Sequence, residues 1–244
     1  MDAAGISDRG KVREKNEDSY LLCNDGAFRL YAVADGMGGH AAGEVASNLA
    51  LECVRRHVAE HGAKLLEDAG MSVPDFIKTM LDYANLSVLD VGLSERSQAG
   101  MGTTLTMLFG FYGRYWLGHI GDSRAYLINN DGIFHLTEDH TLVTQLVRNG
   151  QLSEEETNCH PQRHILTRAL GTDKSVDFDI MPLACRPGDT VLLCSDGLHS
   201  LVDNEEIHAV AVAGEDIRSI LEKLVSLANE RGGTDNITAV LVQL

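Results

Sequence analysis

Short apolar runs bounded by turn residues recur along this chain and predict β-strands. The strongest are Tyr31–Ala34, Val191–Cys194 and Ile237–Val242, in which nearly every residue is apolar or β-branched. Runs of this length and composition are typical of strands buried inside a sheet. Weaker runs of the same kind predict strands at Asp2–Ser7, Ser19–Asn24, Thr104–Phe109, Arg114–Ile120, Arg124–Asn129 and Ile133–Leu136.

Turn residues stand between several of these runs. Asp25-Gly26 predicts a hairpin that leads into Tyr31–Ala34. Gly110–Gly113 and Asn130–Gly132 divide the middle of the chain into what we expect to be one antiparallel meander. Short turns of this kind join antiparallel strands, so the sheets are predicted to be antiparallel.

Other stretches repeat apolar residues at helical spacing. A first helix is predicted from about Ala41, with Gly62 as its stop, and a second at Val73–Leu93. Three more are expected at Leu142–Val147, Glu205–Val212 and Ile217–Glu230. Groups of strands that alternate with pairs of helices, joined by short turns, predict an α+β fold without a linker or internal repeat.

Aspartates stand where the apolar strands end or begin. Asp35 and Asp196 each follow a fully apolar run, and Asp235 precedes the last one. If the last strand runs antiparallel to Val191–Cys194, Asp196 and Asp235 meet at one edge of the sheet. Asp122 follows its own strand and can join them. The alternative is an ordinary turn, because Asp-Gly is a common turn dipeptide.

Charge and cysteine content narrow the classes of function. The 244 residues carry a formal net charge of −16, which repels nucleic acids and acidic membranes. No apolar run is long enough to cross a bilayer, and the N-terminus has no secretion signal, so we expect a cytoplasmic protein without a membrane partner. The 5 cysteines are widely spaced, which excludes a disulfide framework and a zinc site.

Aspartates gathered at one edge repel each other unless cations lie among them. Mg²⁺ and Mn²⁺ prefer carboxylate, carbonyl and water oxygens, and two such ions can activate a shared water molecule. No Gly-x-Ser-x-Gly motif offers a serine nucleophile for a covalent intermediate. A phosphohydrolase built from these residues would therefore use metal-activated water.

The sequence also carries a set of motifs in a fixed order. They are Arg13-x-x-Asn16-Glu17-Asp18, Val33-Ala34-Asp35-Gly36-Met37-Gly38-Gly39-His40, Gly102-Thr103-Thr104, Gly121-Asp122-Ser123-Arg124, Ser195-Asp196-Gly197-Leu198 and Gly233-Thr234-Asp235-Asn236-Ile237-Thr238. In these motifs and their order the chain resembles bacterial members of the PP2C (PPM) family of protein serine/threonine phosphatases. The resemblance spans nearly the whole chain and implies one domain, 1–244, with a four-layer α-β-β-α sandwich of two antiparallel sheets.

The resemblance also implies roles for individual residues. Asp35 would bridge two Mn²⁺ or Mg²⁺ ions, with the Gly36 carbonyl on one of them, and Asp196 and Asp235 would complete the second site. Asp122 with Asp196 matches a third metal position. The remaining matches are Arg13 for the substrate phosphate, Glu17 and Asp18 for the waters around the metals, and a flap near 146–172.

One position departs from the family pattern. Animal members place a histidine directly after the Asp-Gly, as general acid for the leaving alkoxide, and here Met37 stands in that place. His40 lies close by and is the alternative general acid, although it can equally be a structural residue at a helix start. A water on the third metal is another candidate. His119 and His140 are interpreted as structural.

These matches imply a metal-dependent phosphatase for phosphoserine and phosphothreonine in proteins, monomeric and opposed to a eukaryotic-like Ser/Thr kinase. Two alternatives remain open: a non-catalytic relative that only binds phosphoproteins, and a phosphohydrolase of small phosphate esters. The first is disfavoured because every metal-binding aspartate of the motifs is present.

Overall fold

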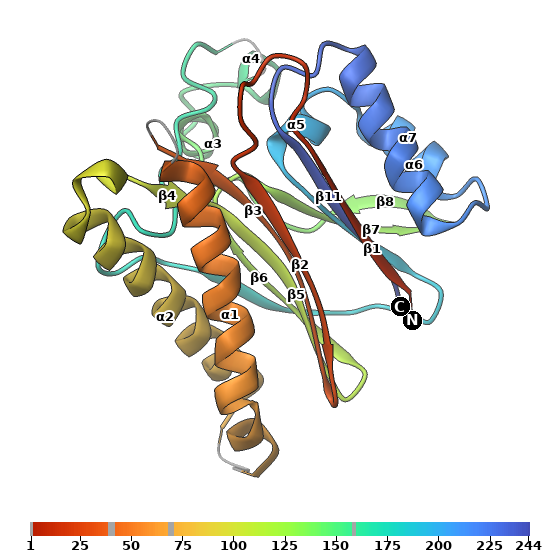
Figure 1. The fold of residues 1–244 in the computed structure, drawn as a ribbon. Helices are drawn as coiled ribbons and strands as arrows, with labels where there is room; N and C mark the ends of the chain where they lie inside the picture. The colour runs from red at the N-terminus through yellow and green to blue at the C-terminus, as the bar shows by residue number, and fades with distance from the viewer. Residues whose placement is uncertain (1, 39–41, 68–70, 158–159) are drawn as a thin grey trace.

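The apolar runs assemble into two antiparallel sheets that lie face to face, with helices on both outer sides (Figure 1). The computed structural model describes residues 2–38, 42–67, 71–157 and 160–244. The β3 sheet has the order β2-β3-β5-β6-β9, and the short strand β4 also pairs with β3. The β10 sheet has the order β1-β11-β10-β7-β8.

The strands of the β3 sheet are β2 (Asp18–Asp25), β3 (Phe28–Met37), β4 (Gly102–Thr103), β5 (Leu105–Phe111), β6 (Arg114–Ile120) and β9 (Asp179–Leu183). Those of the β10 sheet are β1 (Ala3–Asp8), β7 (Arg124–Asn129), β8 (Gly132–His135), β10 (Thr190–Cys194) and β11 (Ile237–Gln243). The predicted hairpin is confirmed, because β2 and β3 pair antiparallel on either side of Gly26.

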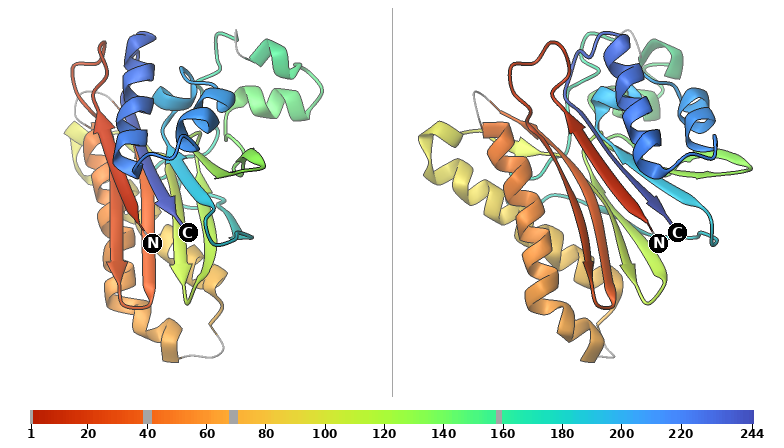
Figure 2. Two further views of the ribbon diagram at one scale, coloured as in Figure 1. Left: turned by 90° about the vertical axis from the view of Figure 1, so that its right-hand side faces the viewer. Right: turned by 45° about the vertical axis from the view of Figure 1, so that its right-hand side comes forward.

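Helices cover the outer face of each sheet. Two long helices, α1 (Ala42–Glu67) and α2 (Val73–Ser94), pack on the β3 sheet, and α5 (Asp196–His199), α6 (Asn204–Ala211) and α7 (Ile217–Glu230) pack on the β10 sheet. The remaining helices are the 3₁₀ turn Arg96–Gln98, α3 (Leu142–Arg148) and α4 (Glu154–Thr157). Figure 2 shows the layers from two further sides and the two termini close together.

Strand β3 shows why the sheets stack. Leu30, Ala32 and Ala34 face the helices, whereas Tyr31 and Val33 point into the layer between the sheets. Successive strand residues point to opposite faces, so a continuous apolar run supplies two cores at once. The α+β class and the sandwich of two antiparallel sheets flanked by helices are thereby confirmed.

Gly62 does not end the first helix. Helix α1 continues to Glu67, and Gly62 lies buried within it against the ring of Phe28. A Cβ atom at this position would lie 2.7 Å from that ring. The glycine therefore serves the close packing of α1 on β3, and its weak helix propensity is overridden by tertiary contact.

The predicted single meander is also wrong, because the chain changes sheets in its middle. Strand β6 pairs with β5 and β9, whereas β7 pairs with β10 and β8. The crossover runs through Gly121, whose φ of 107° is readily accessible only to glycine. Period-2 alternation marks strands but does not say which sheet each one joins.

The stretch between β8 and β9, which includes the predicted flap, is partly buried. Leu170 is fully buried, and Thr103 and Leu170 exchange backbone hydrogen bonds, which places the end of this stretch beside β4. Strand β9 was not predicted from the sequence, since Pro182 interrupts its pattern. Among the described residues, no helix combines the length and apolar character needed to span a membrane.

Candidate active site

Asp35 is held near the end of β3 by hydrogen bonds of its backbone. Its N–H donates to Thr104 Oγ1 at 2.9 Å, and its carbonyl accepts from Thr104 N and from Thr103 Oγ1, each at 2.9 Å. The next residue, Gly36, donates its N–H to the carbonyl of Glu17 at 3.2 Å. With the backbone fixed on both sides, the Asp35 carboxylate has a defined position at this end of the sheet.

Asp18 lies directly across from Asp35, because the two are paired in the β2–β3 register. Opposed residues of an antiparallel pair have Cβ atoms about 5 Å apart, so the two carboxyl groups are near neighbours. Ser195 donates to Asp18 Oδ2 at 2.7 Å and accepts from Thr238 N at 3.0 Å. Asp18 is thus tied to the strand end that carries Asp196.

Strands β10 and β11 bring the two distant aspartates together as the sequence suggested. They pair antiparallel up to Cys194 and Ala239, so Asp196 follows one strand where Asp235 precedes the other. Asp122 reaches the same place from the crossover between the sheets. Asp35, Asp122, Asp196 and Asp235 all line one hollow.

The environment of these carboxyl groups disfavours their ionised forms. Burial raises the pKa of Asp18 to about 7, despite the hydrogen bond from Ser195. Burial, with added repulsion from Asp18 and then Asp196, holds the pKa of Asp35 well above its usual range. The pKa of Asp122 is likewise held well above its usual range by burial and then by Asp196. Like charges that must share a buried site are the physical cause.

Asp196 also has a raised pKa, and two carboxylate oxygens of the described residues here lack a hydrogen-bond partner. Burial and then Asp235 raise the pKa of Asp196. Among the described residues, Oδ1 of Asp18 and Oδ1 of Asp196 are buried without a hydrogen-bond partner. A buried carboxylate oxygen without a partner is costly. A divalent cation nearby would neutralise the repulsion and satisfy such oxygens.

The donor set therefore fits a hard divalent cation. The hollow is lined by carboxylates, and oxygen ligands are what Mg²⁺ and Mn²⁺ prefer. In the described ranges, no three His, Cys, Asp or Glu side chains surround one point closely enough to hold an ion by themselves. A Mg²⁺ site commonly takes only one or two carboxylates and keeps several waters.

Asn236 is a structural residue of the site that sequence reasoning did not single out. Its side-chain amide donates to the carbonyls of Arg9 and Lys15, at 2.9 and 2.8 Å, and its Oδ1 accepts from Glu17 N at 2.8 Å. This one side chain closes the polar loop between β1 and β2 onto the start of β11. Its position directly after Asp235 in the last motif was the available signal.

The loop held by Asn236 carries Arg13 and Glu17 to the rim of the hollow. Arg13 Nη2 donates to Asp235 Oδ2 at 2.7 Å, and this hydrogen bond raises the pKa of Arg13. The Arg13 side chain remains 54% exposed, which leaves it accessible from solvent. Burial raises the pKa of Glu17, and Arg13 opposes that shift.

His40, the histidine considered as general acid, lies outside the residues that the structure describes. Met37, which stands where animal members of the family have a histidine, lines the hollow. A different histidine, His164, lines the same hollow, with Nδ1 3.9 Å from Asp196 Oδ2. No motif pointed to His164, because it lies in the polar stretch between α4 and β9.

His119 and His140 lie in the interior. His119 Nε2 contacts the Glu138 carbonyl at 3.0 Å, and burial lowers its pKa to about 4. Gly121 N donates to His140 Nδ1 at 3.1 Å, and His140 Nε2 contacts Asp179 Oδ2 at the same distance. Both rings thus fasten the crossover that carries Asp122, in keeping with the structural interpretation.

The chain matches known proteins over nearly its whole length. The family model described as "Protein phosphatase 2C" matches residues 9–242. A serine/threonine phosphatase stp of Listeria innocua is 36% identical over 249 residues, which cover 100% of this chain and 96% of that protein.

Solved structures agree with the sequence relatives. The Mycobacterium tuberculosis serine/threonine phosphatase PstP/Ppp superposes with a TM-score of 0.86 at 39% identity, covering 100% of this chain and 98% of that one. The catalytic domain of a PstP in complex with two manganese ions gives 0.80 at 36% identity, covering 99% of this chain and 97% of the other. The chain belongs to the protein phosphatase 2C family.

Proposed function

We propose that this protein hydrolyses phosphoserine and phosphothreonine in proteins and depends on Mn²⁺ or Mg²⁺ for that activity. The observation that carries the proposal is the convergence of Asp35, Asp196 and Asp235, from three distant parts of the chain, on one hollow in which Oδ1 of Asp196 is buried without a hydrogen-bond partner among the described residues. Relatives named serine/threonine phosphatases, one of them solved with manganese, support it.

In this proposal Asp35, the Gly36 carbonyl, Asp196 and Asp235 hold two ions. Asp122 joins Asp196 at a third. When bound, divalent cations lower the pKa of a water molecule and neutralise charge on a phosphoryl group. Glu17 and Asp18 accept hydrogen bonds from the water molecules around the ions. Because the pKa of Asp18 is raised, a nearby cation would favour its ionised form.

Arg13 binds the phosphate of the substrate. Its guanidinium has five N–H donors, and the contact with Asp235 is made through Nη2. Because the side chain is half exposed at the rim of the hollow, its other donors can meet phosphate oxygens. The pairing with Asp235 places the positive charge beside the metal-binding carboxylates before a substrate arrives.

We further propose that the segment near 146–172 is a flap that governs access to the site. Its C-terminal part lines the hollow through Leu166, Thr167, Arg168, Ala169 and Thr172. Within the segment, Leu166 forms an isolated bridge with Thr141, which lies just before it. His40 and a water on a third metal are the two candidates for protonating the leaving oxygen, and a eukaryotic-like Ser/Thr kinase is the expected opponent of the enzyme.

The test is phosphate release from matched phosphothreonine and phosphoserine peptides and from a small ester such as p-nitrophenyl phosphate. Each substrate is assayed with Mn²⁺, with Mg²⁺ and with excess chelator. We expect turnover of the peptides with either metal and none in chelator. Undiminished turnover in chelator contradicts the metal mechanism, and turnover of the small ester alone supports the small-ester phosphohydrolase instead.

A further inference from the structure

Asp122 and Asp196 approach each other just beyond the ends of two paired strands. The pairing of β7 with β10 runs up to Arg124 and Cys194, so each aspartate lies two residues past the last rung of the ladder. The ladder hydrogen bonds therefore do not fix these two aspartates directly. Another contact has to set their separation.

His199 makes that contact. It is the last residue of α5, the short helix that begins with Asp196. Its Nε2 lies 3.0 Å from the backbone carbonyl oxygen of Asp122. Because a carbonyl can only accept, Nε2 carries the hydrogen and donates it. One helical turn thus carries both the Asp196 carboxylate and a hydrogen bond to Asp122.

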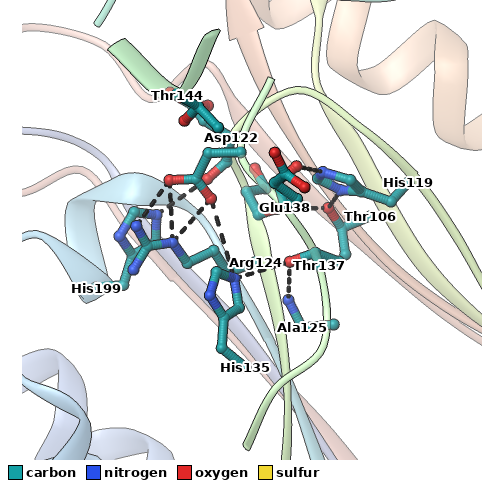
Figure 3. A network of polar contacts seen from close by, with 12 residues as sticks. Thr106, His119, Asp122, Arg124, Ala125, His135, Thr137, Glu138, Thr144 and His199 are labelled. Atoms are coloured by element: carbon teal, nitrogen blue, oxygen red, sulfur yellow. Dashed lines mark hydrogen bonds and ion pairs between the residues drawn. The ribbon is translucent and has the colours of Figure 1, made fainter. Parts of the chain in front are cut away.

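The imidazole ring is itself held in place by its surroundings. Burial, followed by the charge of Arg124, lowers the pKa of His199 to about 3, so the ring is neutral near pH 7. Arg124 pairs with Asp139 through Nε to Oδ1 at 2.9 Å and through Nη2 to Oδ2 at 2.7 Å. Figure 3 shows His199, Arg124 and His135 converging from three elements beside Asp122. The ring is thus one part of a packed polar cluster.

We propose that His199 is a positioning residue that sets Asp122 at the distance from Asp196 at which the two carboxylates share a divalent cation. The inference rests on the metal assignment proposed above and adds a residue outside the motifs. In this scheme His199 acts through the hydrogen bond from its Nε2 to the Asp122 carbonyl, and no metal contact is assigned to its ring. Groups that orient a metal ligand typically change metal affinity by about 10- to 100-fold when they are removed.

The experiment measures Mn²⁺ binding by isothermal titration calorimetry and by electron paramagnetic resonance of free Mn²⁺, without substrate. His199→Leu removes the donor and keeps an apolar volume, and His199→Gln restores a donor at a similar reach. His208→Leu is the matched control, because His208 Nε2 makes the same kind of contact with the Asn129 carbonyl, at the opposite end of β7. Asp122→Asn and Asp35→Asn identify which binding event belongs to which carboxylate.

We expect His199→Leu to weaken by about tenfold or more the Mn²⁺ event that Asp122→Asn removes, and to leave the event that Asp35→Asn removes unchanged. His199→Gln should stay within about threefold of the wild-type protein, and His208→Leu should bind as the wild-type protein does. In the His199→Leu/Asp122→Asn double variant, His199→Leu should add nothing to the loss that Asp122→Asn causes alone.

Three results overturn the proposal. One is a His199→Leu protein that binds every Mn²⁺ ion like the wild-type protein, whatever its melting temperature. Another is an equal loss at all ions. The third is a wild-type protein without any Mn²⁺ event that Asp122→Asn removes. Failure of the metal assignment itself gives a different result, in which Asp35→Asn does not weaken Mn²⁺ binding.

Discussion

Two polar clusters meet at the crossover between the sheets, and they differ in how their charges are balanced. In the aspartate cluster, Asp18, Asp35 and Asp196 repel each other, and burial raises each pKa. In the neighbouring cluster Arg124 pairs with Asp139, and that pairing outweighs burial, so the pKa of Asp139 is lowered. Asp122 belongs to the first cluster and touches the second through His199.

This difference distinguishes the candidate metal site, which is the aspartate cluster, from the structural cluster beside it. Opposite charges that are fully hydrogen-bonded satisfy each other and need no ligand. Like charges that fold together weaken the metal-free protein and make it a good binder of cations, which is a common relation between stability and function. The fold therefore confines the unfavourable repulsion to the aspartate cluster, and the neighbouring cluster of Arg124 and Asp139 supports that site structurally.

The largest expected effect comes from Asp35→Asn. Loss of this carboxylate should reduce kcat/KM by at least about 10³-fold, since a bound cation contributes several kcal/mol to stabilising transition-state charge. In chelator the same variant should melt no lower than the wild-type protein, because one repelling charge is gone. The measurements are peptide dephosphorylation with Mn²⁺ and calorimetric melting in EDTA.

Asp90→Asn is the matched control for that prediction. Asp90 lies exposed on α2, so its neutralisation changes the net charge by the same amount away from the site. It should leave both measurements unchanged. Wild-type turnover in Asp35→Asn would remove Asp35 from the metal site.

In the cluster of paired charges, Asp139→Asn should lower the stability of the protein, whereas Asp35→Asn in chelator should not. This change leaves Arg124 buried without its partner and should cost about 3 kcal/mol of unfolding free energy, at the lower end for a buried pair because both side chains are partly exposed. Urea denaturation with and without Mn²⁺ measures it. Asp82→Asn, which breaks the exposed pair with Lys78 on α2, should cost only about 0.5 kcal/mol. Equal losses in the two variants would contradict the distinction between the clusters.

The smallest effect, per pH unit, is a pH dependence of the metal-free protein. The pKa of Asp18 is about 7 in the folded state against 3.8 for the free group, so the folded state binds the extra proton between these values. Its contribution to stability is complete below about pH 4 and is lost as the pH rises toward 7. The slope is about 1.4 kcal/mol per pH unit for one such proton.

Urea denaturation in EDTA from pH 5 to 8 measures this slope. Asp18→Asn should flatten it relative to the wild-type protein, since the amide does not titrate. Saturating Mn²⁺ should also abolish the difference, because cations hold the carboxylates ionised. Parallel curves for the two proteins in EDTA would show that Asp18 is not the group responsible.

Much of the fold could be predicted from the local pattern of apolar and polar residues. The apolar runs at Tyr31–Ala34, Val191–Cys194 and Ile237–Val242 became β3, β10 and β11, because continuous apolar runs have few alternatives to a buried strand. The errors arose where a distant contact overrode a local preference. Gly62 continues a helix because it packs on Phe28.

The candidate site likewise contains residues that the sequence predicted and residues that it did not. Asp35, Asp196 and Asp235 were predictable because each marks a strand end, and antiparallel pairing brings such ends together. Asn236, Ser195 and His199 were not singled out, since a hydrogen bond to a distant backbone or carboxylate leaves no period in the sequence.

By itself, the sequence determined which residues form strands and helices and which carboxylates stand at their ends, because side-chain periodicity and turn chemistry act over a few residues. Only the tertiary structure decided which sheet each strand joins, which aspartates repel each other and which partners hold them. Those outcomes depend on burial and on distances between segments far apart in the sequence, such as Ser7 and Thr238, which are 231 residues apart and in contact.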